Sequence, residues 1–107
     1  MNMKTLNNLQ YALKQKGYII CINSTQFYNY ESKRFIKVFQ VKHNKKILFK
    51  SVSLNRIFRC VAGIYRELNT LDTNIDREEV ENHINNYLIK FEEELNNEQS
   101  TNNQEET

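Results

Sequence analysis

The spacing of apolar residues changes twice along the chain, and these changes separate predicted helices from predicted strands. Over residues 5–16, leucines from Leu6 to Leu13 recur three and four positions apart, which predicts an amphipathic helix. Thr5 is placed to cap its first turn. Gly17 follows its last residue, as is typical of a helix that ends at a left-handed backbone position.

From Tyr18 onward, β-branched and aromatic residues dominate, and these residues favour strands. This composition recurs in the segments YIICIN, RFIKVFQVK and KILFKSV, and the first segment continues into QFYNY. The polar links near residues 31–33 and 43–45 are short, as between consecutive antiparallel strands. Asn44 is the best candidate for a left-handed backbone angle in the second link. We therefore expect three or four antiparallel strands.

Helical spacing returns in the second half of the chain. Residues 54–68 carry apolar side chains at i, i+3, i+4 and i+7 without a break, and Ser53 is a suitable N-cap. After a polar link, a last helix is predicted over about residues 76–95, where Asp76 and Glu79 have the spacing of a capping box.

Together these elements predict an α+β fold. An N-terminal helix precedes a sheet of three or four antiparallel strands with helices on one face, and two C-terminal helices follow. We expect a single small domain over residues 1–95, since about 95 residues suffice for one core. Residues 96–107 contain no apolar residue and are predicted to form a disordered polar and acidic tail.

Charge divides the chain more sharply than composition does. Residues 1–66 hold 13 of the 15 Lys and Arg residues and one acid, Glu31, which gives a formal charge of +12. Residues 67–107 hold two basic residues and 12 acids, which gives −10. The total of +2 hides this asymmetry. It indicates a basic binding surface and an acidic segment that either shields this surface or serves another partner.

Three arginines share one face of the helix predicted over residues 54–68. Arg56, Arg59 and Arg66 fall within an arc of about 80°, opposite the apolar stripe. Gly63 lies on the same face, where it would let a backbone or a phosphate come close. Arginine forms bidentate contacts with phosphate and with guanine edges, which favours a nucleic-acid contact. Pairing with the acidic last helix and plain solvation are the two alternatives.

A second basic group lies in the predicted strands, on a hairpin. Basic hairpin tips reach grooves and phosphates, although lysines on exposed strands also prevent edge-to-edge pairing. Phe27, Tyr28 and Tyr30 lie beside these residues and are suited either to stacking on unpaired bases or to packing in the sheet. The candidate nucleic-acid-binding residues are Lys33, Arg34, Lys37, Lys42, His43, Asn44, Lys45, Lys46, Lys50, Arg56, Arg59 and Arg66.

The sequence offers little to an enzyme. His43 and His83 have no Cys or His partners at zinc-binding spacing, and two glycines cannot form a phosphate-binding loop. Cys21 and Cys60 fall within apolar patterns, which predicts free, unreactive thiols. We expect no enzymatic activity, no metal and no cofactor. Apolar runs fall short of the roughly 20 residues that span a bilayer, so we expect a cytoplasmic protein without a membrane partner.

Residues 17–68 resemble small proteins carried by phages and plasmids of low-GC Gram-positive bacteria. The stretch in question is GYIICINSTQFYNYESKRFIKVFQVKHNKKILFKSVSLNRIFRCVAGIYREL. The likeness lies in three strands followed by a helix that ends in an aromatic and a basic residue. The resemblance implies a mobile genetic element as the source and assigns no functional residue.

Three hypotheses follow from these patterns. The leading one is a small DNA-binding accessory or regulatory protein of a mobile element that binds duplex DNA with a basic hairpin and an arginine-bearing helix. The alternative is a phage-encoded, anti-CRISPR-like inhibitor of a host defence or nucleic-acid enzyme, acting through the acidic C-terminal helix. A third is an interaction module whose halves neutralise each other. A homodimer through apolar helix faces is a further expectation.

Overall fold

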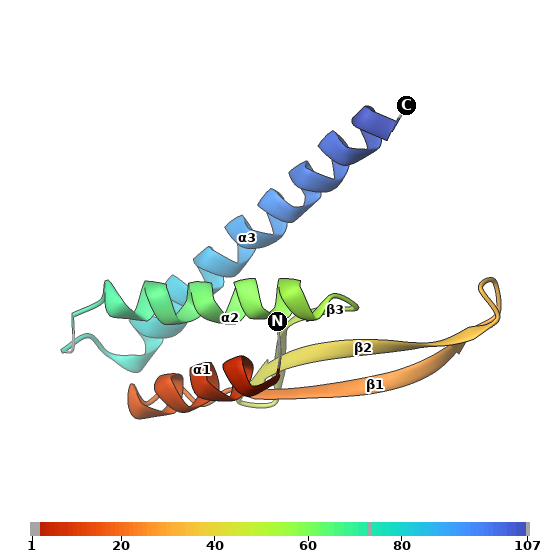
Figure 1. Ribbon diagram of the computed structural model, residues 1–107. Helices are drawn as coiled ribbons and strands as arrows, with labels where there is room; N and C mark the ends of the chain where they lie inside the picture. Colours follow the sequence, from red (N-terminus) through yellow and green to blue (C-terminus); the bar gives the residue numbers. More distant parts are fainter. Residues whose placement is uncertain (1–2, 73, 107) are drawn as a thin grey trace. The chain divides into compact units, whose positions relative to one another are not determined.

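The computed structural model describes residues 3–72 and 74–106, with side chains over residues 4–72 and 74–98. The elements in chain order are α1 (Met3–Gln15), β1 (Cys21–Asn29), β2 (Arg34–His43), β3 (Lys46–Ser51), α2 (Leu54–Asn69) and α3 (Arg77–Glu106) (Figure 1). This order confirms the predicted α+β fold. The described sheet has three strands, because residues 24 and 25 continue β1 and do not begin a fourth strand.

The chain divides into two compact units, Met1–Arg66 and Glu67–Thr107. The boundary lies within the last turn of α2 and coincides with the charge boundary. We call the first the basic unit, with its formal charge of +12, and the second the acidic unit, with −10. Each unit is described by itself below, and the single domain over residues 1–95 stays a prediction.

The end of α1 has the structure that Gly17 predicts. The Tyr18 N–H donates to the Leu13 carbonyl at 3.0 Å, and the Gly17 N–H donates to the Lys14 carbonyl at 2.9 Å. Gly17 has a φ of +83°, which completes a Schellman motif. The start of α1 differs from the prediction, because the helix begins at Met3 and Thr5 therefore lies inside its first turn, not at its cap.

The sheet has the strand order β1-β2-β3, with antiparallel pairing throughout. β1 and β2 pair along their whole length, from Cys21 opposite Lys42 to Asn29 opposite Arg34. β3 pairs with β2 over residues 39–43 only. In the described chain, the distal part of the β1–β2 hairpin therefore has no third strand beside it. We call this part, residues 25–38, the arm; it reaches away from α1 in Figure 1.

The core of the basic unit comes from both helices and the sheet. Ser53 caps α2 as predicted, because its Oγ accepts the N–H of Arg56 at 3.3 Å. Burial of each large apolar side chain contributes about 1.5–3 kcal/mol, so the buried apolar residues of this core supply much of the stability of the basic unit. The buried apolar residues are Leu6, Leu13, Tyr18, Ile20, Val41, Phe49, Ile57, Cys60, Val61 and Ile64.

In the acidic unit, the long helix α3 begins after the predicted cap. The Oδ1 of Asp76 accepts the N–H of Glu79 at 2.9 Å. Four apolar side chains at helical spacing, from Ile84 to Leu95, are buried as the sequence predicts. His83 Nε2 lies 3.1 Å from Oε2 of Glu67 within the same unit.

The C-terminal end of α3 differs from the sequence prediction. The helix continues to Glu106, so residues 96–106 are helical where a disordered tail is predicted. This stretch contains neither Gly nor Pro, so it lacks the residues that most strongly end a helix. Thr107, the last residue of the predicted tail, lies outside the described residues. No helix in the described part of the chain is both long and apolar enough to cross a membrane.

Candidate nucleic-acid interface

The twelve predicted binding residues fall in three separate places. Lys33, Arg34 and Lys37 belong to the arm, a second group surrounds the β2–β3 turn, and three arginines lie on α2. The first two groups are at opposite ends of β2, a strand of 10 residues. At about 3.3 Å per residue, those ends are roughly 30 Å apart. The single basic hairpin tip predicted from the sequence is therefore wrong, because β2 belongs to two hairpins that turn at opposite ends.

The tip of the arm is a tight turn held by Asn29. Its side-chain Oδ1 accepts the N–H groups of Glu31 and Ser32, at 2.9 and 3.1 Å. The Lys33 N–H donates to the Asn29 carbonyl at 2.8 Å, and Lys33 has a left-handed φ of 58°. This hydrogen-bonded turn fixes where β2 starts and therefore the positions of the cationic residues at its beginning.

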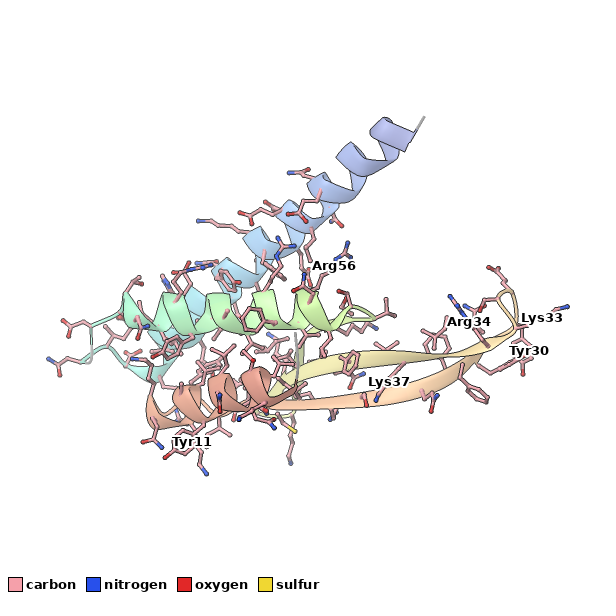
Figure 2. The ribbon with its side chains drawn as sticks, viewed as in Figure 1. Tyr11, Tyr30, Lys33, Arg34, Lys37 and Arg56 are labelled. Carbon is pink, nitrogen blue, oxygen red and sulfur yellow. The ribbon has the colours of Figure 1, made fainter. Side chains whose placement is uncertain are left out.

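The cationic side chains of the arm are exposed. Lys33, Arg34 and Lys37 all lie at the surface, and Figure 2 shows the first two at the tip together with Tyr30. Successive side chains of a strand point to opposite faces, so Arg34 and Lys37 lie on different faces of the ribbon. The arm contains one acid, Glu31, so its formal charge is +2. The arm can therefore present positive charge to an anionic partner from either face.

Three aromatic rings gather on one face and the tip of the arm. The rings of Tyr28 and Phe35, which are directly opposite each other in the ladder, meet edge to face with centroids 5.2 Å apart. Tyr30 also meets Tyr28 edge to face, at 4.9 Å. Tyr28, Tyr30 and Phe35 are 39%, 83% and 65% exposed. We call these three residues the ring cluster. Tyr28 packs on Phe35 across the ladder, as one of the two alternatives expects, and stacking on bases stays a prediction.

The ring cluster lies on the extension of the core face of the sheet. Phe35 shares its strand face with Lys37 and with the fully buried Val41, because the three positions differ by even numbers. The same face is thus buried where β3 lies beside β2 and exposed along the arm. On the opposite face, Phe27 pairs with Ile36, and Phe27 is also exposed. Both faces of the arm therefore carry apolar surface.

The group at the β2–β3 turn includes one residue that the fold itself uses. His43 is half-buried, and both of its ring nitrogens have hydrogen-bonding neighbours. Asn44 and Lys45 form the two-residue turn with φ angles of 51° and 67°, the pattern of a type I′ hairpin. This confirms the left-handed angle predicted at Asn44. Lys45, Lys46 and Lys50 are exposed, whereas Lys42 is half-buried.

The arginine face of α2 is less open than the sequence predicts. Arg66 is exposed, but Arg56 and Arg59 are half-buried. Gly63, predicted to admit a phosphate on this face, is itself buried. The expectation of a bare arginine face is therefore wrong, since helical spacing gives the direction of a side chain but not what covers it.

The two cysteines differ in exposure, although both fall within apolar sequence patterns. Cys60 is buried as predicted, whereas Cys21, on β1, is exposed. Across the described residues, no three His, Cys, Asp or Glu side chains come together in a way that would hold a metal ion.

Phe35 is absent from the predicted site. A signal for it exists in the sequence, because the third predicted strand is shorter than the second, which leaves part of the first hairpin without a third strand beside it.

No protein-family model matches the chain, and no curated protein or solved structure matches it at a significant level of similarity.

Proposed function

We propose that the basic unit binds duplex DNA and that the arm is its main contact element. The observation that carries this proposal is the exposed two-stranded ribbon with Lys33, Arg34 and Lys37 at and near its tip. A two-stranded β-ribbon fits the major groove of B-DNA, and cationic side chains bind the phosphates that line a groove. The protein would serve as a small accessory or regulatory factor of a mobile genetic element.

The charge of the basic unit supports this partner. A formal charge of +12 on 66 residues attracts a polyanion over long range and raises the rate of encounter. Each phosphate that a Lys or Arg side chain neutralises releases condensed counterions, which favours binding without readout of sequence. Binding should therefore weaken steeply as salt concentration rises.

The test measures binding of a fluorescently labelled 20-base-pair duplex by anisotropy across a salt series. The double variant Lys33→Ala/Arg34→Ala removes two charges from the arm. The matched control Lys4→Ala/Lys14→Ala removes two charges from exposed positions of α1. We expect the arm variant to bind more weakly and to flatten the log–log salt dependence by about two units, since each contact contributes about 0.9. The control should change the slope by less.

Two results would contradict the proposal. A wild-type protein that binds no duplex at low salt would rule out duplex DNA as the partner. Equal losses in the arm variant and the α1 control would show that total charge matters and that the arm is not the contact element.

A second candidate function rests on the acidic unit. Six acids of α3 are exposed among the described side chains, namely Glu78, Glu79, Glu92, Glu93, Glu94 and Glu98. Closely spaced carboxylates on a helix can imitate phosphate charge and occupy the nucleic-acid channel of a host defence enzyme. In that case the wild-type protein slows duplex cleavage by an RNA-guided nuclease. The triple variant Glu92→Gln/Glu93→Gln/Glu94→Gln would lose this inhibition, while the arm variant would keep it.

A further inference from the structure

The ring cluster provides an interaction that the charge of the arm does not. We propose that the ring cluster stacks on unpaired or unstacked bases, so that the protein prefers DNA with a gap or a single-stranded segment over intact duplex. This inference rests on the proposed function, because it requires that the arm lies on DNA. It names the structural class of DNA that the arm selects.

The ring cluster is exposed to solvent. Tyr30 and Phe35 leave 83% and 65% of their surfaces open to solvent, and Tyr28 contacts both rings edge to face. Rings that meet edge to face leave ring surface available to a further flat group. Large exposed apolar patches on small proteins usually mark binding surfaces.

The neighbours of the ring cluster identify the chemistry of the partner. Tyr30 shares the arm tip with Lys33 and Arg34 (Figure 2). The Nζ of Lys37 lies 5.5 Å from the centroid of Phe39, on the same strand face as Phe35. A partner that suits this surface has flat π faces and closely spaced negative charges. Nucleic acid with accessible bases has both, because each base offers a π face and each nucleotide a phosphate.

The ring cluster can stack only on bases whose faces are open to it. In an intact duplex the base faces are covered by their neighbours, and a protein ring reaches them only by opening a base step. A gap or a single-stranded segment exposes these faces, so no free energy is needed to unstack the bases. The ring cluster should therefore gain more contact on gapped DNA than on duplex, while the phosphate contacts of the cationic residues stay similar.

The experiment compares an intact duplex, the same duplex with a four-nucleotide gap, and the single strand, at one salt concentration. Tyr30→Leu keeps an apolar side chain but removes the ring, and Tyr30→Phe keeps the ring. Tyr11→Leu is the matched control, because Tyr11 is 67% exposed on α1 (Figure 2). We expect wild type, Tyr30→Phe and Tyr11→Leu to prefer gapped DNA. Tyr30→Leu should lose at least about fivefold of affinity for it, the lower end for one stacked base.

The outcomes separate this inference from the proposed function. If Tyr30→Leu binds gapped DNA as wild type does, while Lys33→Ala/Arg34→Ala weakens binding to every DNA, stacking is overturned and DNA binding stands. If wild type binds none of the three DNAs, the proposed function fails. A protein that shows no preference for gapped DNA and dimerises through Tyr30, measured by sedimentation, would assign the ring cluster to a second copy of the chain and also overturn stacking.

Discussion

The imidazole ring of His43 lies flat on the phenol ring of Tyr18, with centroids 4.0 Å apart and planes inclined by 13°. Its Nδ1 lies 2.8 Å from the Ile19 carbonyl oxygen and donates to it, because a carbonyl can only accept. The Nε2 then accepts from the side-chain N–H of Asn44, at 3.2 Å. His43 thus joins the chain before β1 to the β2–β3 turn, which assigns it a structural role beside its predicted binding role.

The first prediction follows from this contact. His43→Ala should lower the free energy of unfolding by about 1–3 kcal/mol, through loss of an aromatic pair and of hydrogen bonds. His43→Phe keeps the stacked ring and should lose only about 1 kcal/mol. Urea denaturation measures both, with Lys46→Ala, at the exposed first position of β3, as the control. Equal stability of His43→Ala and the control would show that the contact contributes nothing.

A second prediction concerns the backbone of the β2–β3 turn. Lys45 has a φ of 67°, a conformation that glycine adopts without steric strain. Lys45→Gly creates the Asn-Gly pair that type I′ turns prefer, so we expect the free energy of unfolding to rise by about 0.5–1 kcal/mol. Thermal denaturation checks this sign. A lower melting temperature than wild type would mean that the left-handed angle does not limit stability here.

The third prediction concerns the end of α1. A Cβ at Gly17 would meet no atom within 4 Å, so only the φ of +83° opposes a side chain. Gly17→Ala should therefore destabilise the protein by about 1–2 kcal/mol, the usual penalty for a left-handed residue with a Cβ. Gly17→Asn should lose less, because Asn tolerates this conformation. If chemical denaturation finds Ala as stable as Gly, the helix ends in another way in solution.

A fourth prediction compares a buried with an exposed apolar residue. Ile57 is fully buried in α2, and Val52, just before this helix, is 63% exposed. Ile57→Ala should lower the free energy of unfolding by about 2–5 kcal/mol through lost burial and a cavity. Val52→Ala should change it by under about 0.5 kcal/mol. Denaturant titrations that rank the two variants in the opposite order would show that the phase of α2 is wrong.

The fifth prediction concerns the end of α3. Residues 97–107 contain no apolar side chain, so their deletion should shift the melting temperature by less than about 4 °C, the effect of about 1 kcal/mol in a domain of this size. Under the proposed function, the loss of Glu98, Glu105 and Glu106 should leave DNA affinity at low salt unchanged or modestly higher. A truncated protein that no longer folds would contradict the prediction and show that this end of the helix is required.

The fold could be predicted from local signals. Gly17, Ser53, Asn44 and Asp76 act through their own backbone angles or through hydrogen bonds to residues close in sequence, so each marks a boundary without knowledge of tertiary structure. The end of α3 could not be predicted, since α3 continues through a stretch with neither a stop residue nor an apolar stripe.

The interface was harder to predict, because the exposure of a strand face depends on how far the core that packs over it extends. Phe35 and Val41 lie on the same strand face in the same apolar pattern, yet one is exposed and the other is buried. The difference arises because the buried core, to which α1 and α2 contribute, includes Val41 but no residue of the arm. The half-burial of Arg56 could not be predicted either, because helical spacing gives the direction of a side chain but not what covers it.

The alternation of side chains along the arm restricts how its length can vary. Removing one residue from each strand keeps the two strands paired but moves the turn and its neighbours to the opposite face of the ribbon. The rings now on the side of Val41 would then lie on the side of Ile36. Insertions and deletions that keep the rings on their present face should therefore add or remove two residues on each strand. The arm should accordingly lengthen or shorten in steps of two residues per strand.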